Sequence, residues 1–351
     1  MPLADRALVV GIDRYPAISV LSGAENDAKA FHTWVTSSGQ VESRNTLLLT
    51  SSAFTAAANA DDERPAKEQI ERFFTDIDNA AEANNQAGLG HQAGRRLWMF
   101  FSGHGFSPSL DKSAVLMANA SLKRVHSVAA MMWANRFYEG GWFDEVILFQ
   151  DACRTPISDV ELVPPFLRKK QASLGQTRRR FYAFSAKDRL ISKEKMFEKD
   201  MRGVFSATLM QGLNGDARDP KTGAITTAQL KLFLQDNMRK SLSPQELEDD
   251  EIAKVPEVYD PDPFDIVAAP PGWNTAPIFP LEIAVANPGK RIWIEGAAFA
   301  TVAAEDQAPP VWSVPLPRGY YRVRYEGAEV TFEVTGAVKA DGSQVVENVS
   351  I

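Results

Sequence analysis

Cys153 is the only cysteine of this 351-residue chain, and it follows an apolar run that is typical of a buried strand, residues 146–150. His104 follows a second such run, residues 97–101. One class of peptide-bond cleavage requires a thiolate nucleophile and an imidazole that moves protons. In an open α/β sheet, the loops at the carboxyl ends of the strands assemble the active site. The sequence therefore predicts that Cys153 and His104 meet at one sheet edge as a catalytic pair.

A single cysteine excludes an intrachain disulfide and any metal site built from several cysteines. Free cysteine is also among the most buried residue types. A structural thiol and a satisfied histidine are therefore the alternative interpretation of Cys153 and His104. The order of the surrounding motifs favours catalysis over this alternative.

The composition is typical of a globular protein, with 44% hydrophobic and 24% charged residues. The net charge of −7 and the scattered basic residues predict no nucleic-acid partner. The N-terminus lacks the charged-then-apolar layout of a signal peptide, and the apolar residues 7–12 are too short to cross a bilayer. We therefore expect no membrane partner and a cytoplasmic location, where a thiol stays reduced.

The elements that must position the pair alternate between short β-type runs and helical patterns. This alternation predicts an α/β fold, with a mostly parallel sheet covered by helices. Both candidate residues then follow strands of the sheet. Strands are expected over residues 7–12, 46–50, 95–101, 145–150 and 181–186, and helices over residues 23–35, 67–83, 204–213 and 227–237.

The pattern changes past about residue 242, where an acidic run and a proline-rich stretch without helical period are typical of a linker. Alternating apolar segments separated by turn residues then indicate a small all-β module. Its strands are expected over residues 281–286, 291–294, 320–325 and 329–334. We therefore predict a large domain over residues 1–245, a linker over 246–278 and a small β-rich domain over 279–351.

Five short motifs occur in the order that is found in one known family, over roughly residues 1–242. On these motifs the chain resembles a bacterial caspase-like cysteine peptidase of the metacaspase and orthocaspase type, in the caspase clan. The separation of 49 positions from His104 to Cys153 agrees with the caspase signature, in which the histidine lies about 50 residues upstream. The resemblance implies a three-layer α/β/α fold. The motifs are Ala7-Leu8-Val9-Val10-Gly11-Ile12, Gly23-Ala24-Glu25-Asn26-Asp27, Ser102-Gly103-His104-Gly105, Asp151-Ala152-Cys153-Arg154 and Gly203-Val204-Phe205-Ser206.

The resemblance also implies a role for each residue of the pair. Cys153 would attack the scissile carbonyl, and His104 would protonate the leaving amine and later activate water. The backbone N–H groups of Gly105 and Cys153 would form the oxyanion hole. Thr155 stands where the caspase signature has glycine, so the loop that follows the cysteine is expected to differ.

Carboxylates near the pair predict which substrates are cleaved. Asp151 stands where the caspase signature has glutamine. In metacaspase-like enzymes the positions of Asp27, Asp151 and Ser102 line the S1 pocket. Two carboxylates in a partly desolvated pocket favour a cation and reject an anion, which predicts cleavage after Arg or Lys. The alternatives are a helix N-terminal residue for Asp27, a carboxylate that binds loop amides for Asp151 and a plain turn serine for Ser102.

A basic segment lies between the catalytic strand and the next one. In relatives this region is often a cleavable activation loop, so Lys169, Lys170, Arg178, Arg179 and Arg180 are candidate self-cleavage sites; the alternative is a solvated loop. Some metacaspases require calcium, but the acidic residues 246–251 lack the ligand spacing of an EF-hand. The sequence therefore supports no metal site and no other cofactor, and it leaves calcium dependence open.

The sequence thus predicts a cysteine endopeptidase that acts on proteins or peptides with a basic P1 residue. The alternative is a catalytically silent scaffold that keeps the same fold as an interaction module. A flavodoxin-like nucleotide binder is disfavoured, because residues 13–16 contain no glycine-rich phosphate loop. The C-terminal β module is expected to bind a regulatory protein partner.

Overall fold

The computed structural model describes residues 4–109, 112–121, 123–157, 159–168, 175–187, 189–197, 199–270, 278–296, 301–335 and 347–351. The chain forms two compact units, one of residues 1–217 with 225–267 and one of residues 218–224 with 268–351. Each unit has its own hydrophobic core.

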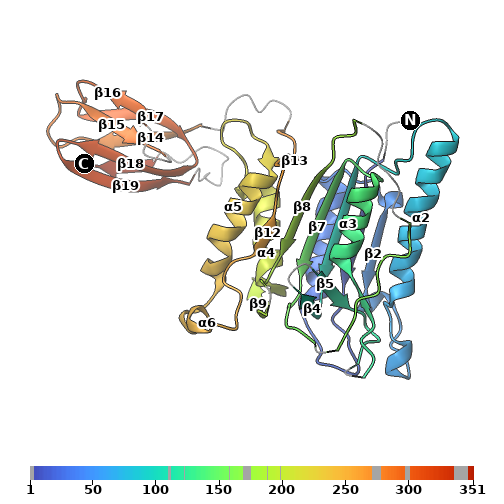
Figure 1. Ribbon diagram of the computed structural model, residues 1–351. Coiled ribbons are helices and arrows are strands. Elements are labelled where there is room, and N and C mark those ends of the chain that lie inside the picture. The colour runs from blue at the N-terminus through green and yellow to red at the C-terminus, as the bar shows by residue number, and fades with distance from the viewer. Residues whose placement is uncertain are drawn as a thin grey trace. The chain divides into compact units, whose positions relative to one another are not determined.

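A six-stranded sheet in the order β12-β8-β7-β3-β1-β2 forms the centre of the first unit (Figure 1). Its first five strands in the chain pair in parallel, whereas β12 runs antiparallel to β8. β3 and β7 are buried along their whole length, as expected for strands that are covered on both faces. The strands are β1 (Arg6–Gly11), β2 (Thr46–Thr50), β3 (Arg96–Ser102), β7 (Glu145–Asp151), β8 (Arg179–Phe184) and β12 (Glu257–Tyr259).

Helices cover both faces of this sheet, because successive strand residues point to opposite sides. Val10 and Phe101 pack in one core cluster with α2 and α3, and Val9 and Phe100 pack in another with α1, α4 and α5. The predicted α/β fold with a mostly parallel central sheet is therefore confirmed. Among the helices of the described ranges, none is both long and apolar enough to cross a bilayer. The helices are α1 (Ala24–Ser37), α2 (Lys67–Gln86), α3 (Ala130–Gly140), α4 (Val204–Gln211), α5 (Thr227–Asn237) and α6 (Pro244–Glu248).

Short antiparallel sheets follow the ends of the central strands. β4 (Gly105–Ser109), β5 (Lys112–Leu116) and β6 (Ser127–Val128) form one of them, directly after β3. β9 (Glu194–Phe197) and β10 (Asp200–Gly203) form a second, which leads into α4. Both small sheets contribute residues to the site described below.

The region predicted as a linker, residues 246–278, belongs largely to the first unit. β12 pairs with β8 in the central sheet, and β13 (Asp265–Val267) pairs with β11 (Ile225–Thr226). The apolar side chains of Phe264 and Ile266 are buried in the core that α4 and α5 share. Pro261 and Pro263 lie between β12 and β13, so a composition typical of a linker here reflects short strands and the turn between them. The prediction was therefore wrong for residues 246–267.

The second unit is built from two antiparallel-rich sheets, in the orders β17-β14-β20 and β16-β15-β18-β19. Ile283 of the first sheet and Val323 of the second share one core, so the sheets pack face to face. The predicted all-β character of the C-terminal part is confirmed. The strands are β14 (Ile278–Ala284), β15 (Ile292–Glu295), β16 (Thr301–Glu305), β17 (Val311–Pro317), β18 (Gly319–Tyr325), β19 (Ala328–Val334) and β20 (Glu347–Ser350).

Candidate active site

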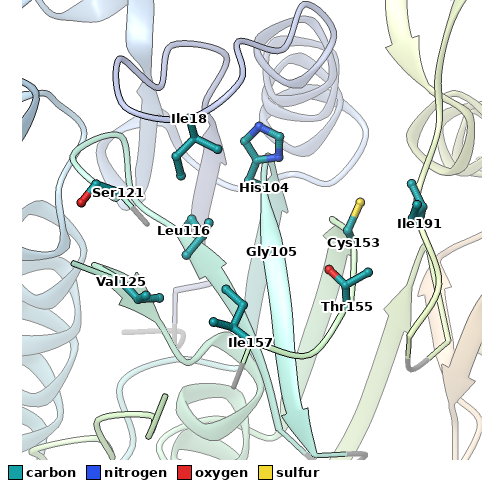
Figure 2. A pocket seen from close by; sticks show the side chains of 10 residues that line it. All are labelled: Ile18, His104, Gly105, Leu116, Ser121, Val125, Cys153, Thr155, Ile157 and Ile191. Carbon is teal, nitrogen blue, oxygen red and sulfur yellow. The ribbon is translucent and has the colours of Figure 1, made fainter. Parts of the chain in front are cut away.

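His104 and Cys153 follow neighbouring parallel strands. Ser102, the last residue of β3, is the register partner of Asp151, the last residue of β7. His104 and Cys153 each stand two positions after this pair, so the two segments that carry them leave the sheet side by side. Figure 2 shows the imidazole and the thiol lining the same pocket. The two residues of the predicted pair therefore lie at one sheet edge.

The loop that follows β1 fixes the His104 imidazole. Its Nε2 atom lies 2.7 Å from the backbone oxygen of Ser19 and 3.2 Å from the Ser19 hydroxyl. Because a carbonyl oxygen only accepts, Nε2 carries the proton of this bond and Nδ1 is left as the basic nitrogen. The imidazole can therefore accept a proton at Nδ1 while Ser19 holds its tautomer.

Tyr15 supports the same histidine through its backbone and its ring. The Tyr15 ring is fully buried, and its centroid lies 4.7 Å from that of the imidazole. The backbone N–H of His104 donates to the Tyr15 hydroxyl at 3.0 Å, and this hydroxyl donates to the Leu116 carbonyl at 3.3 Å. The sequence analysis missed Tyr15 and Ser19, because they come from a loop whose path no local pattern specifies.

The Cys153 side chain is half-buried, and its Sγ atom lies 4.0 Å from the backbone oxygen of Ser192. Burial raises the pKa of the Cys153 thiol, and this effect outweighs the hydrogen bond to Ser192. At neutral pH the resting group is therefore a thiol, which needs a base before it can act as a nucleophile.

Gly105 lies where β4 passes against the turn that carries Cys153. A Cβ atom at position 105 would lie 2.7 Å from the Cβ of Ala152 and 2.9 Å from the Cys153 carbonyl oxygen. Any side chain would therefore push the two segments apart. Glycine at this position lets the backbone of residue 105 lie directly beside that of Cys153.

A pocket of about 200 Å³, which we name the polar pocket, opens beside the thiol. Ser102 and Asp151 line it, as do Glu194 and Lys193. Two carboxylates and one cation therefore face this pocket. The sequence analysis singled out Ser102 and Asp151 but missed Glu194, which lies on the β9–β10 hairpin, outside the five motifs.

Hydrogen bonds hold the Asp151 carboxylate at the start of α4. Its Oδ2 atom accepts from the backbone N–H of Ser206 at 3.0 Å and from the Ser206 hydroxyl at 2.7 Å. Its Oδ1 atom accepts from the Ser192 hydroxyl at 2.6 Å. The side chain thus accepts from one helix amide and two hydroxyls, and it also lines the polar pocket. Its position is fixed before any ligand arrives.

Asp27 lies behind this pocket and does not line it. Its side chain is fully buried, its Oδ1 forms an ion pair with Arg202, and its Oδ2 accepts from the Gly203 N–H at 2.9 Å and from Ser102 Oγ at 3.4 Å. A Cβ atom on Gly203 would lie 2.0 Å from Asp151 Oδ2 and 3.0 Å from Asp27 Oδ2, so only glycine fits between the two carboxylates. Burial and the charge of Asp151 raise the pKa of Asp27 to about 8, against the opposing effect of Arg202.

Two further charged groups connect this region to α1 and β10. The Glu194 carboxylate accepts from the backbone N–H groups of Gly23 at 2.9 Å and Ser22 at 3.3 Å, at the N-terminus of α1. Arg202 donates from Nε to Asp27, and its Nη2 is buried without a hydrogen-bond partner among the described residues. The chain thus supplies one cation of its own to the carboxylates behind the polar pocket.

The basic residues predicted as self-cleavage sites divide into two groups. Lys169 and Lys170 lie outside the described residues. Arg178 donates to the carbonyl oxygens of residues 138 and 139 at 2.9 and 2.8 Å, and Arg179 and Arg180 begin β8, where they contact Glu145 and Asn135. These three arginines therefore have structural partners at the start of a central strand.

A family model described as the caspase domain matches residues 4–261. The chain belongs to the caspase-domain family. This match covers the whole first unit up to β12, and it supports a cysteine peptidase in general, with protein substrates.

Two solved structures are similar to this caspase-domain chain. Caspase-1 from Spodoptera frugiperda is 12% identical, with a TM-score of 0.47 over 77% of this chain and 93% of that one. The structure titled pro-sf-caspase-1 is 12% identical, with a TM-score of 0.43 over 74% of this chain and 91% of that one. No curated protein matches the chain.

Proposed function

We propose that the protein is a cysteine endopeptidase that uses Cys153 and His104 as a dyad and cleaves after Arg or Lys. The observation that carries this proposal is the placement of a thiol and a tautomer-fixed imidazole at one sheet edge, beside a pocket lined by two carboxylates. Family membership supports the peptide-hydrolysing part, and the pocket supports the basic specificity.

The acylation step follows from the geometry of the two side chains. The Cys153 thiol proton passes to Nδ1 of His104, and Sγ attacks the scissile carbonyl carbon. The negative charge that develops on the carbonyl oxygen is stabilised by the backbone N–H groups of Gly105 and Cys153. His104 then gives its proton to the leaving amine, and an acyl thioester remains on Cys153.

In deacylation, His104 takes a proton from water as the water oxygen attacks the thioester, and returns it to the departing sulfur. Ser19 and Tyr15 act as positioning residues in both steps. Because the Ser19 carbonyl binds Nε2, the positive charge on the imidazolium is stabilised and Nδ1 keeps its direction toward the reaction.

The basic specificity rests on charge in a confined space. Asp151 and Glu194 line the polar pocket, and behind Asp151 lies the buried Asp27, which becomes a charged carboxylate only as the pH rises toward 8 and above. A cationic P1 side chain gains charge-assisted hydrogen bonds there, whereas an anionic one would be repelled. Lys193 also lines the pocket and carries the opposite charge, so the net preference for a cation depends on the two carboxylates of Asp151 and Glu194.

Fluorogenic peptides with Arg, Lys or Asp at P1, assayed with wild type and Cys153→Ala, test this function. Turnover of the Arg and Lys peptides by wild type alone is the expected result. Turnover of the Asp peptide alone would contradict the reading of the polar pocket but leave the dyad intact. Turnover retained in Cys153→Ala would contradict the whole proposal.

A catalytically silent scaffold is the alternative function. A peptidyl-arginine chloromethylketone separates the two, because a catalytic thiol displaces chloride and forms a thioether with the reagent. We expect one adduct on Cys153, seen as a mass increase of the intact protein, and none on Cys153→Ala. A scaffold with an inert thiol would give no adduct in either protein.

Self-cleavage and a regulatory partner of the second unit are further parts of the proposal. Mass spectrometry of the purified chain, compared with Cys153→Ala, tests for Cys153-dependent cuts after Lys169, Lys170, Arg178, Arg179 or Arg180. The contacts of the three arginines at β8 favour cuts at the two lysines.

A further inference from the structure

The catalytic pair has a second pocket on its other side, which we name the apolar pocket (Figure 2). Its volume is about 370 Å³, compared with about 200 Å³ for the polar pocket. The two pockets share only His104, Cys153 and Ile191 among their lining residues. The thiol and the imidazole therefore stand between two cavities of different chemistry.

The walls of the apolar pocket are aliphatic. Ile18, Val125 and Ile157 are each partly buried against the core, and Leu116 lies beside them. The other lining side chains, apart from the catalytic pair, are the neutral hydroxyls of Ser121 and Thr155 and the aliphatic Ile191. Among the residues that the structure describes, no Asp, Glu, Lys or Arg is part of this lining. Such a cavity stabilises an apolar side chain by removing it from water, and it offers a charged one no partner.

The segments that form this pocket are those that surround His104. Ile18 precedes Ser19, whose carbonyl binds the imidazole, and Leu116 exchanges hydrogen bonds with Tyr15 and with the His104 carbonyl. The polar pocket, in contrast, is formed by the ends of β3 and β7 and by the β9–β10 hairpin. The apolar pocket thus lies on the side of the general acid.

The reaction assigns an occupant to that side. With a basic P1 side chain in the polar pocket and the carbonyl carbon at Cys153 Sγ, the leaving nitrogen must face His104, which protonates it. The residue that begins at this nitrogen is P1′, so its side chain departs from the scissile bond toward the apolar pocket. We propose that this pocket is the S1′ subsite and selects a large aliphatic or aromatic residue directly after the cleaved bond.

This inference rests on the proposed function and adds the second half of the substrate sequence. Cavities that hold small ligands have volumes of about 300–1,000 Å³, so the pocket has room for a Leu, Phe or Trp side chain. A peptide that buries such a side chain should have a kcat/KM about 10- to 100-fold higher than a peptide whose P1′ side chain stays exposed. The favoured site is therefore Arg or Lys followed by a large apolar residue.

Internally quenched peptides whose only basic residue is one Arg test the subsite, with P1′ varied among Leu, Phe, Gly, Asp and Gln. A second series varies P2 in the same way. We expect kcat/KM for Leu and Phe at P1′ to exceed that for Asp and Gln by about 10- to 100-fold. A flat P1′ profile, or a preference that falls on P2, would overturn the assignment.

Two variants of the pocket wall and one matched control sharpen this test. Val125→Asp places a charge in the pocket wall, so the ratio of kcat/KM for Leu over Gly at P1′ should fall strongly. Val125→Thr keeps the shape of the valine side chain, so the same ratio should fall only slightly. Val163→Asp makes the same change at a valine that is 63% exposed and lines neither pocket. An equal fall of this ratio in Val163→Asp would contradict the proposal. Equal melting temperatures of wild type and the variants would exclude unfolding as the cause of a fall.

Peptide binding to Cys153→Ala, followed by fluorescence anisotropy, separates the subsite from the proposed catalysis. Tighter binding of an Arg-Leu than of an Arg-Asp peptide, lost in the double variant with Val125→Asp, supports the pocket even when wild type cleaves neither peptide. In that case only the peptidase function fails. Turnover without a P1′ preference would leave the peptidase function intact and overturn the S1′ assignment. Equal cleavage and equal binding of the Arg-Leu and Arg-Asp peptides would also overturn the S1′ assignment.

Discussion

The two sides of the catalytic pair are built on different principles. On the side of the polar pocket, nearly every charged group already has a partner: Asp151 binds Ser206 and Ser192, and Asp27 binds Gly203 and Arg202. On the side of the apolar pocket, the walls are side chains that only fill space. The polar pocket thus presents charged groups that are fixed in advance, whereas the apolar pocket presents only a cavity of a given size.

The largest effect is expected from the residue that both sides share. His104→Ala removes the base that takes the thiol proton and the acid that serves the leaving amine, so kcat/KM should fall about 10⁴-fold or more for every peptide. Steady-state kinetics with peptides that differ at P1 and at P1′ measure this loss. A loss confined to one class of peptide would show that the two pockets do not share one reaction centre.

Asp151→Asn tests the polar side alone. It keeps the shape of the side chain but removes its charge, so we expect kcat/KM for Arg and Lys peptides to fall about 100-fold. The P1′ preference, taken as a ratio between two Arg peptides, should stay constant. Asp250→Asn is the matched control, because its side chain is fully exposed and lines neither pocket. An equal loss in the control would disprove the assigned role.

The pH dependence of specificity tests the contribution of Asp27. Its pKa of about 8 means that it gains its charge as the pH rises, and a charged Asp27 favours a cation in the polar pocket. The ratio of kcat/KM for P1 Arg over P1 Gln should therefore rise about tenfold between about pH 7 and pH 9. This ratio cancels the titration of the catalytic pair. A ratio that is independent of pH, or that still rises in Asp27→Asn, would refute the assignment.

The titration of Asp27 also affects the stability of the fold, which should decrease as the pH rises. Because the folded pKa is raised above the unfolded value, the protonated carboxyl favours folding. This contribution is full below the unfolded pKa of about 3.9, and it is lost as the pH rises toward 8. The melting temperature of wild type should therefore fall relative to that of Asp27→Asn over this range, and parallel curves would contradict the buried titration.

The smallest effect is expected from Arg202, the cation that the chain itself places on Asp27. Since Arg202 lowers the pKa of Asp27, Arg202→Gln should move the midpoint of the specificity ratio to higher pH and lower the ratio at pH 8 by about threefold. Arg202→Lys keeps the charge and serves as the control. An unchanged midpoint in Arg202→Gln would show that this ion pair has no influence on the polar pocket.

The sequence predicted those parts of the site that follow strands. His104, Cys153, Ser102 and Asp151 all stand at or just beyond the end of an apolar run, and the ends of parallel strands lie at one edge whatever the loops do. The central sheet and the β-rich C-terminal part were predicted for the same reason. Periodicity and apolar runs specify which residues must be buried.

The parts that the sequence did not predict depend on contacts between distant segments. Glu194 binds the backbone of Gly23, 171 residues before it, and Arg202 binds Asp27, 175 residues before it. Ser19 and Tyr15 reach His104 through a loop without a regular pattern. β12 is a three-residue strand between prolines, too short to be recognised before its partner β8 is in place.

β12 also has a consequence for how the chain can be divided. Arg154, the residue after the nucleophile, is buried and forms a 2.5 Å ion pair with Glu257 of β12. A chain cut at residue 245 would lose this strand and expose the backbone edge of β8, and it would release a tether one residue away from Cys153. A chain cut after residue 267 keeps both β12 and the ion pair between Arg154 and Glu257. The integrity of the first unit therefore depends on a strand that lies more than a hundred residues beyond Cys153.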